Sequence, residues 1–331
     1  MDLALQPNSS ASPKTPLIRC LFMISAFVLM QAALLAPAAA QGCEPGKCIR
    51  IGSYNIKYFA NNGPANTPDE IDQLVNRITD EANLDVAVLE EINKSGAEWT
   101  GPGGLRAKLG ARGYEVAIEG SFGGEDPGRP QYIVLLYRGK AVSLVAGSTG
   151  EIDIPTSFNE GGTCTYNGLR PPVMARFKAA GGAFEFRVVG VHMKSQLKVG
   201  TDEKCDDRIR TFQAEKILAH IAKLKKDDES QPQSIVVGDF NAEFTAPEYS
   251  GFGAAGYRSM IQGNCSTASM DQCSYIQSPY ESLIDHVVVH SSLMQAVAGS
   301  GTLARVQDLA KYLKSQSDHV PVWASFRVDP K

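Results

Sequence analysis

Hydrophobic residues along most of the chain fall into short runs that predict β-strands, interrupted by two longer segments with helical spacing. The first segment, residues 67–82 (TPDEIDQLVNRITDEA), begins with Thr67 as a cap, followed by Pro68 and by Glu70 three residues after the cap. Its apolar residues recur on one helical face, and so do those of residues 206–224 (DDRIRTFQAEKILAHIAKL). Each segment therefore predicts an amphipathic helix, and each is followed by a short hydrophobic strand.

The predicted strands are runs of β-favouring residues that stop at polar or turn-forming positions. They are IRIGSYNIKYF, DVAVLEEI, YIVLLYR, VMARF, FRVVGVHM, SIVVGDF, DHVVVH and VPVWASF. Long Gly-rich loops are expected at residues 95–128, 147–170 and 250–280. Because 43% of residues are hydrophobic and no shift in composition marks a boundary, we expect one α/β domain from about residue 49 to 329.

Residues 1–40 have the pattern of an export signal. Two basic residues precede an apolar run from Cys20 to Leu35, and the alanines at 38–40 suit a signal-peptidase site. The length of the run also allows an uncleaved membrane anchor, but polar residues within it and the alanine exit favour cleavage. We therefore expect a mature chain of residues 41–331, without a transmembrane segment, that is secreted or periplasmic.

The charge balance limits how this chain can hold a polyanion. The full sequence carries 32 Lys and Arg against 36 Asp and Glu, a formal net charge of −4. Loss of residues 1–40 removes Lys14, Arg19 and Asp2, which leaves a net charge of about −5. A phosphate-bearing substrate must therefore be held by local cations or through a metal ion, because overall charge repels it.

Six cysteines remain after the export signal is removed. An even number in an exported chain predicts disulfides, and the spacing favours two local pairs and one across a long loop. A zinc site is the rival interpretation, but no two of these cysteines form a Cys-x-x-Cys pair. The expected pairs are Cys43–Cys48, Cys265–Cys273 and Cys164–Cys205.

Polar residues capable of chemistry sit at or near the ends of the predicted strands. Strand ends at one edge of an α/β core are rigid points from which side chains can converge on a cavity. Carboxylate and amide oxygens suit an ion such as Mg²⁺, and imidazoles can bind or protonate a phosphoryl oxygen. The residues concerned are Asn55, Glu90, Glu91, His192, Asp239, Asn241, Asp285, His286, Asp318 and His319.

Six motifs in fixed order carry a family resemblance: SYNIKYF, LEEI, VHMKS, GDFN, IDH and SDHVPV. Together they resemble the endonuclease/exonuclease/phosphatase superfamily, which includes pancreatic deoxyribonuclease, abasic-site endonucleases and neutral sphingomyelinases. The resemblance implies an α/β fold of the DNase I-like kind, a four-layered α/β/β/α sandwich of two mixed sheets flanked by helices. It also implies metal-dependent hydrolysis of phosphate esters.

The resemblance assigns a metal site to three residues. Asn55, Glu91 and Asp318 match the family's metal positions, and Glu90 stands behind them where many members carry glutamine. The implied ion is Mg²⁺, with Mn²⁺ as an alternative and Ca²⁺ left open as a structural ion.

The resemblance also assigns the reacting groups. Asp239 would orient or activate the attacking water, and Asn241 would hold a phosphate oxygen. His319 would contact the scissile phosphate while Asp285 orients its ring. His192 and Arg170 match further phosphate-binding positions.

One position departs from the family pattern. Deoxyribonuclease-like members often have a glutamate that orients the histidine matching His192, whereas this chain has Gln131. An amide can accept a hydrogen bond from the ring but stabilises its cation less than a carboxylate would. We therefore expect His192 to bind phosphate more than to act as a general acid.

Each residue also has a plainer structural explanation. GDFN alone is typical of a tight turn, and a lone histidine at a strand end is usually structural. We expect His220, His286 and His290 to be structural. The joint order of the motifs is what favours a shared site.

The predicted function is an exported nuclease that cleaves DNA, with activity on RNA left open. A phosphatase or a sphingomyelinase- or phosphoinositide-type esterase is the second hypothesis, and a binding or toxin-like subunit the third. A basic lip after the His192 strand favours a polyanion, although such a run is usually a solvated loop. The lip would comprise Lys194, Lys198, Lys204, Arg208 and Arg210. No sequence feature indicates oligomerisation, so a monomer is expected.

Overall fold

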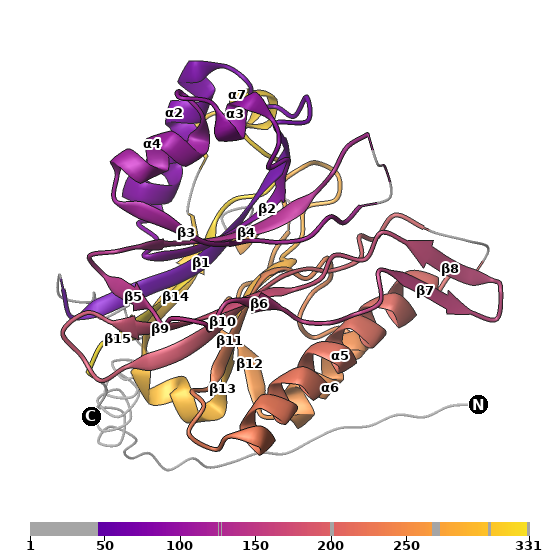
Figure 1. Ribbon diagram of the computed structural model, residues 1–331. Coiled ribbons are helices and arrows are strands. Elements are labelled where there is room, and N and C mark those ends of the chain that lie inside the picture. The colour runs from indigo at the N-terminus through magenta and orange to yellow at the C-terminus, as the bar shows by residue number, and fades with distance from the viewer. Residues whose placement is uncertain are drawn as a thin grey trace, which may run out of the picture. The chain divides into compact units, whose positions relative to one another are not determined.

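The computed structural model describes residues 46–124, 126, 128–198, 202–266, 272–303 and 306–329, all within the unit Gly42–Lys331. The predicted export signal at residues 1–40 lies outside the described residues. Within this unit, two β-sheets pack face to face and helices cover their outer faces (Figure 1). This is the four-layered DNase I-like sandwich that the sequence predicts.

The first sheet is six-stranded and mixed, in the order β14–β15–β1–β2–β4–β3. β1 and β2 run parallel, and the other pairings are antiparallel. Its strands are β1 (Cys48–Phe59), β2 (Val86–Ile92), β3 (Tyr114–Glu119), β4 (Tyr132–Arg138), β14 (Val297–Thr302) and β15 (Val322–Arg327).

The second sheet has the order β12–β13–β11–β10–β9–β5, with β6 also paired to β9. Here β10 and β11 are the parallel pair. Its strands are β5 (Val142–Leu144), β6 (Gly150–Glu151), β9 (Val173–Ala179), β10 (Glu185–His192), β11 (Ser234–Asp239), β12 (Tyr257–Ser259) and β13 (Asp285–His290). A separate hairpin pairs β7 (Ser157–Glu160) with β8 (Cys164–Asn167).

Helices α2, α3 and α4 lie over the first sheet, and α5 and α6 lie over the second (Figure 1). In the part of the chain that the structure describes, no helix is long and apolar enough to cross a membrane. The helices are α2 (Pro68–Asn76), α3 (Ala97–Thr100), α4 (Leu105–Ala111), α5 (Cys205–Asp227), α6 (Ser250–Ala254) and α7 (Leu309–Ser315). Shorter turns are the π-helical η2 (Arg77–Glu81) and the 3₁₀-helical η3 (Pro247–Tyr249) and η5 (Ser291–Ala296).

Both predicted helices are confirmed. The first begins with the expected capping box, in which Thr67 Oγ1 accepts from Glu70 N at 3.3 Å and the Glu70 carboxylate accepts from Thr67 N at 2.9 Å. Its last predicted turn, Arg77–Glu81, is π-helical instead of α-helical, and Ala82 N accordingly donates to Arg77 O, five residues earlier. The eight predicted strands are confirmed as β1, β2, β4, β9, β10, β11, β13 and β15.

Side-chain alternation builds the core on both faces of each sheet. In β1, Ile49 and Ile51 pack into the cluster between the sheets, while Tyr54 and Ile56 pack beneath the helices. The central strands are buried on both faces, which explains their nearly continuous hydrophobic runs.

The three expected loops contain more structure than the sequence suggests. Residues 95–128 include α3, α4 and β3, residues 147–170 include β6, β7 and β8, and residues 250–280 include α6 and β12. These elements are too short to establish a hydrophobic period. Tertiary contacts stabilise them instead. In α4, for example, Leu105 and Leu109 are buried in the core.

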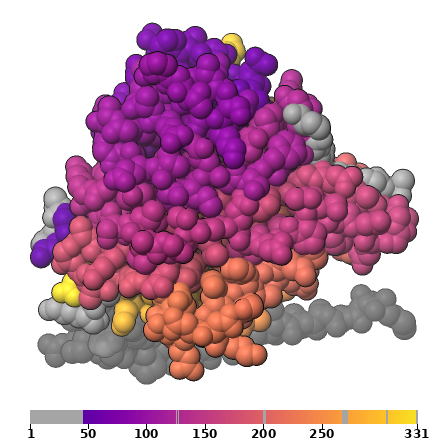
Figure 2. Space-filling view, in the orientation of Figure 1, coloured from indigo at the N-terminus to yellow at the C-terminus, as the bar shows by residue number. Residues whose placement is uncertain are grey.

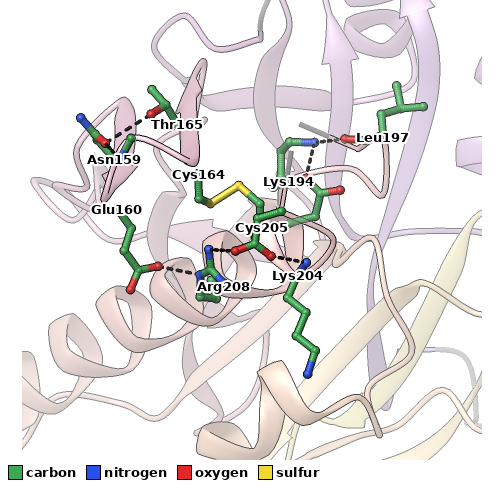
Figure 3. Close-up of a disulfide and its surroundings, with 12 residues drawn as sticks. Asn159, Glu160, Cys164, Thr165, Lys194, Leu197, Lys204, Cys205 and Arg208 are labelled. Carbon is green, nitrogen blue, oxygen red and sulfur yellow. Dashed lines mark hydrogen bonds and ion pairs between the residues drawn. A yellow bond between two sulfur atoms is a disulfide. The ribbon is translucent and has the colours of Figure 1, made fainter. Parts of the chain in front are cut away.

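Two of the three expected disulfides are confirmed. Cys164–Cys205 joins β8 to the first residue of α5 (Figure 3), and Cys265–Cys273 closes a short loop. The third pair includes Cys43, which lies outside the described residues. The β7–β8 hairpin extends at the right-hand margin of the unit (Figure 2), and its Glu160 forms an ion pair with Arg208 of α5 at 2.6 Å.

We predict that the disulfide that closes the longer loop stabilises the fold more, with a logarithmic dependence on loop length. The Cys164–Cys205 pair spans 41 residues and Cys265–Cys273 spans 8. Chain entropy gives losses of about 4 and about 2.5 kcal/mol in the free energy of unfolding on removal of each pair. Guanidinium denaturation of the two double Cys→Ser variants measures both values. A larger loss for the shorter loop would contradict this entropic explanation.

Candidate active site

Strand register brings the predicted acids and imidazoles to one edge of the sandwich. In the second sheet, Asp239 at the end of β11 pairs with His192 of β10 on one side and Asp285 of β13 on the other. In the first sheet, Asn55 of β1 pairs with Glu90 of β2. The two sheets meet here, since Asn55 Nδ2 donates to Asp239 Oδ2 at 3.1 Å.

An irregularity in β2 selects which of two neighbouring glutamates faces the site. The pairing of β2 with β4 shifts register between Leu89 and Ile92, and Glu91 between them has φ of 61°. Glu91 consequently reaches the cavity and accepts from Tyr58 N at 3.0 Å, whereas Glu90 is buried. Left-handed backbone at a non-glycine residue costs roughly 1–3 kcal/mol and clusters at functional sites.

The GDFN segment turns sharply so that its alternate side chains separate. Gly238 has φ of 147°, and a Cβ there would lie 1.9 Å from Val191 O, so another residue does not fit. Phe240 is fully buried against Tyr249, with ring centroids 5.3 Å apart. Asp239 and Asn241 are left on the cavity side, as the sequence predicts.

Asp239 lies at the centre of the site and faces several of its polar groups. Its Oδ1 accepts from Asn241 N at 2.7 Å. Its Oδ2 lies 3.7 Å from His192 Nε2 and 3.8 Å from His319 Nε2. A single buried carboxylate oxygen thus faces two imidazoles and the Asn55 amide.

The two histidines differ in charge because their neighbours differ. Burial lowers the pKa of His319, but Asp285, whose Oδ2 lies 2.8 Å from His319 Nδ1, outweighs it and holds that pKa well above its usual range. Burial and then Arg170 hold the pKa of His192 well below its usual range. At neutral pH the site therefore contains one imidazolium and one neutral imidazole.

Burial, and after it the nearby Asp285, raise the pKa of Asp239 to about 7. The pKa of Glu90 is raised well above its usual range, again chiefly by burial and then by Asp285. These carboxyl groups share one water-poor region, where each disfavours ionisation of the others.

The three predicted metal ligands lie at this site. Asn55 Nδ2 donates to Glu91 Oε1 at 3.2 Å, and Asn55 Oδ1 is buried without a hydrogen-bond partner among the described residues. Asp318 Oδ1 lies 4.0 Å from His319 Nε2, which also faces Asp239. Asp318 Oδ2 forms an ion pair with Lys57 Nζ at 2.6 Å. Hard oxygen donors with one unused carbonyl oxygen fit a hard divalent cation.

A second set of metal-capable atoms belongs to Asp239, Asp285 and His319, which lie within 4.8 Å of one another. In this set, Asp285 and His319 already form a hydrogen bond to each other. This hydrogen bond suits a role of Asp285 in orienting the His319 ring.

These groups lie at a cavity of about 640 Å³. Asn55 and Asp285 stand behind it, bonded to Asp239 and His319 respectively. The predicted residues that line it are Glu91, Arg170, His192, Asp239, Asn241, Asp318 and His319.

Gln131 does not orient His192, contrary to expectation. Its Oε1 accepts from Arg170 Nε at 2.9 Å and from Arg170 Nη2. His192 Nδ1 has no hydrogen-bond partner in the described part of the chain. Gln131 therefore holds the predicted phosphate-binding arginine in the cavity wall.

Of the two interpretations of the basic residues after β10, the basic lip is wrong, because most of these cations face acids of the protein. Lys194 is buried beside Asp206 at 3.4 Å, and Arg210 is buried against Glu248 at 3.0 Å. Two others are similarly paired: Arg208 with Glu160 and Asp202, and Lys198 with Glu203. These pairs stabilise the start of α5 and the loop before it, and Figure 3 shows the pair between Glu160 and Arg208.

Sequence reasoning missed several residues that line the cavity. Lys57 lies two residues after Asn55 in β1, and this spacing places both side chains on one face of the strand. The sequence could therefore have predicted Lys57 as a residue of the site. Tyr275 packs edge-on against His319 with ring centroids 5.1 Å apart, but no pattern around it distinguishes it. Tyr58, Arg129 and Tyr166 also line the cavity.

The family comparison agrees with this geometry. The model of the Endonuclease/Exonuclease/phosphatase family matches residues 52–319, which includes the predicted site from Asn55 to His319. This chain belongs to that family. As a member it is a hydrolase of phosphate esters, in a family that generally depends on divalent metal ions.

Solved structures share the fold at low sequence identity. A family member from Bacteroides thetaiotaomicron has a TM-score of 0.56 and 18% identity, covering 86% of this chain and 99% of that one. The mannosyl-6-phosphatase Bt3783 of the same organism has 0.55 and 18%, covering 83% and 98%. D. rerio TDP2 complexed with single strand DNA product has 0.53 and 16%, covering 85% and 99%. No curated protein matches this chain.

His286 supports the GDFN turn from the core side. Its Nε2 lies 3.2 Å from Ala242 O and therefore donates to that carbonyl, and its ring packs edge-on against Phe240. Burial lowers the pKa of His286 to about 4. The neutral ring is thus part of the support beneath Asp239, in agreement with the structural role expected for it.

We predict that His286 makes the fold acid-sensitive. Between pH 6.5 and 4 the unfolded chain gains a proton that the folded chain resists, so the free energy of unfolding falls by about 3 kcal/mol as the pH drops. Denaturation at several pH values should show this loss as a difference between the native protein and His286→Gln, which has no such proton to gain, because the raised pKa of Asp239 acts in the opposite direction in both proteins. Parallel pH curves for the two proteins would contradict the assignment.

Proposed function

We propose that this family member is an exported, Mg²⁺-dependent phosphodiesterase that hydrolyses nucleic acid, DNA above all and RNA secondarily. The observation that carries the proposal is the Asp239 carboxylate at the cavity, whose Oδ2 lies 3.7 Å from His192 Nε2 and 3.8 Å from His319 Nε2. An open cavity of about 640 Å³ greatly exceeds a phosphoryl group and suits a phosphodiester with its flanking groups. The fold of single-strand DNA-bound TDP2 is compatible with this substrate.

The chain's own residues divide the work of the reaction. Asp239, held at both oxygens by Asn241 N and Asn55, orients the attacking water and receives its proton. Neutral His192, the Asn241 amide and Arg170 bind the non-bridging phosphate oxygens. The His319 imidazolium, fixed by Asp285, stabilises the charge that develops on the phosphate and leaving oxygen.

Asn55, Glu91 and Asp318 would hold the divalent ion. When bound there, Mg²⁺ offsets negative charge on the phosphoryl group, which the acidic chain otherwise repels. Lys57, whose Nζ lies 2.6 Å from Asp318 Oδ2, adds a further positive charge beside the bound phosphate.

Export is supported by the two disulfides, which form in oxidising compartments. The export-signal pattern at residues 1–40 points the same way. The Cys164–Cys205 disulfide holds β8, whose Tyr166 lines the cavity. An oxidising compartment would therefore also stabilise part of the cavity wall.

We predict that Asp239→Asn lowers kcat on DNA about 10²- to 10⁴-fold, because the amide orients water but does not take its proton. Steady-state hydrolysis of plasmid and oligonucleotide in Mg²⁺ measures the effect. The matched control is Glu243→Gln, an exposed acid four residues further along that does not line the cavity. Near-normal turnover by Asp239→Asn would contradict the role assigned to Asp239.

A substrate panel tests the proposal itself. The mature chain is offered plasmid, single-stranded DNA, RNA, sphingomyelin, phosphoinositides and a sugar phosphate, each with and without EDTA. Chelator-sensitive hydrolysis of nucleic acid supports the proposal. Hydrolysis confined to the lipid or the sugar phosphate would replace it with the phosphatase or phospholipase-like alternative.

A further inference from the structure

We propose that Leu197 and Tyr280 form a base-binding rim at the cavity, so that the substrate class is single-stranded nucleic acid with unstacked bases. This inference rests on the proposed nuclease function and deepens it. The two residues bind the nucleosides beside the scissile phosphate, while the buried acids and imidazoles act on the phosphate itself.

Exposure singles out these two side chains. Leu197 is 72% exposed and Tyr280 is 73% exposed, against 42% for Phe122 and 38% for Met294. They are the most exposed large apolar side chains in the part of the chain that the structure describes, and both line the cavity. Exposed apolar surface is costly in water, and its placement at a polar cavity is typical of a ligand-binding rim.

The two residues lie on loops attached to the strands on either side of β11, and both line the cavity that contains the reacting groups. Leu197 follows β10, and Tyr280 precedes β13. These two strands are the neighbours of β11, which ends at Asp239. A strand of nucleic acid whose phosphate reaches Asp239 would therefore pass between Leu197 and Tyr280.

Leu197 is held in place by a buried cation. Lys194 is fully buried, and its Nζ donates to Leu197 O at 2.7 Å and to Ser195 O at 2.9 Å (Figure 3). Its position is fixed in turn by Asp206 at 3.4 Å and by the Tyr166 ring at 4.9 Å. A rigid backbone beneath an exposed leucine lowers the entropy lost when that side chain binds a ligand.

Tyr280 lies on a loop that is built on the catalytic histidine. Its N donates to Gln277 O at 3.0 Å, and Tyr275 and Ser282 exchange two backbone hydrogen bonds at the base of the loop. Tyr275 also bridges to His319 and packs against its ring. The loop that carries Tyr280 is therefore attached at its base to His319.

The chemistry of the rim favours a base over a lipid. An aromatic ring stacks on any base, and the cations Lys57 and Arg170 line the same cavity as the rim, where they can attract a backbone phosphate. A membrane surface requires a wider apolar face bordered by cations, and the cations near Leu197 are paired with acids. Bases in a duplex are already stacked on one another, so the rim binds strands whose bases are free.

Three oligonucleotides test the inference: a thymidylate dodecamer, the same length of abasic tetrahydrofuran phosphodiester, and the thymidylate strand in a duplex. We expect the native enzyme to cleave the single strand with a kcat/KM about 5- to 150-fold above the abasic strand, the range of base stacking. Tyr280→Ala and Leu197→Ser should lose that preference through KM, and Tyr280→Phe should keep it. Met294→Ala, an exposed apolar residue that does not line the cavity, should match the native enzyme.

The outcomes separate this inference from the proposed function. Equal cleavage of thymidylate and abasic strands by the native enzyme, or faster cleavage of the duplex, overturns the base-binding rim and leaves the nuclease intact. An equal loss on both single strands in Tyr280→Ala also overturns it, because the side chain would then act on the backbone or the fold. Cleavage of none of the three overturns the nuclease proposal, and the rim with it.

Discussion

The candidate active site depends on three carboxyl groups that are almost completely buried, those of Asp239, Asp285 and Glu90. Buried carboxylates cost several kcal/mol each unless they are paired or protonated. Here Asp285 is paired with the His319 imidazolium, and Asp239 receives hydrogen bonds from Asn55 and Asn241. Burial still raises the pKa of Asp239 and of Glu90, so these contacts offset the cost of burying the carboxylates only in part. Such a region is poised to accept positive charge, from a proton, a cation or both.

The sandwich supplies the rigidity that this arrangement requires. Gly238, Glu91 and Asn241 all adopt left-handed backbone at or beside the site. Such conformations persist only when the surrounding structure fixes them. The apolar clusters on both faces of the two sheets provide that constraint, with Phe240 and His286 directly beneath the GDFN turn.

The sequence predicts the layers and the reacting residues for different physical reasons. Strands such as SIVVGDF are apolar enough to be identified alone, and the polar residues that end them are exceptional in that setting. Their convergence follows once the fold is known from the motif order. The exposed Tyr280, the partner of Gln131 and the pairing of the expected basic lip depend on loops, where side-chain contacts are set by tertiary structure. Arg210 illustrates the limit, because Glu248, which neutralises it, lies 38 residues away.

Crystals grown with Mn²⁺ in place of Mg²⁺ give the most direct measurement of where the cation binds. Anomalous scattering locates Mn²⁺ independently of any assumption about its ligands. We expect a peak coordinated by Asn55 Oδ1, Glu91 and Asp318, with Lys57 displaced from Asp318. A peak bound instead by Asp239, Asp285 and His319, or no peak at this edge of the sandwich at saturating Mn²⁺, would contradict the assignment of the metal and the reacting groups.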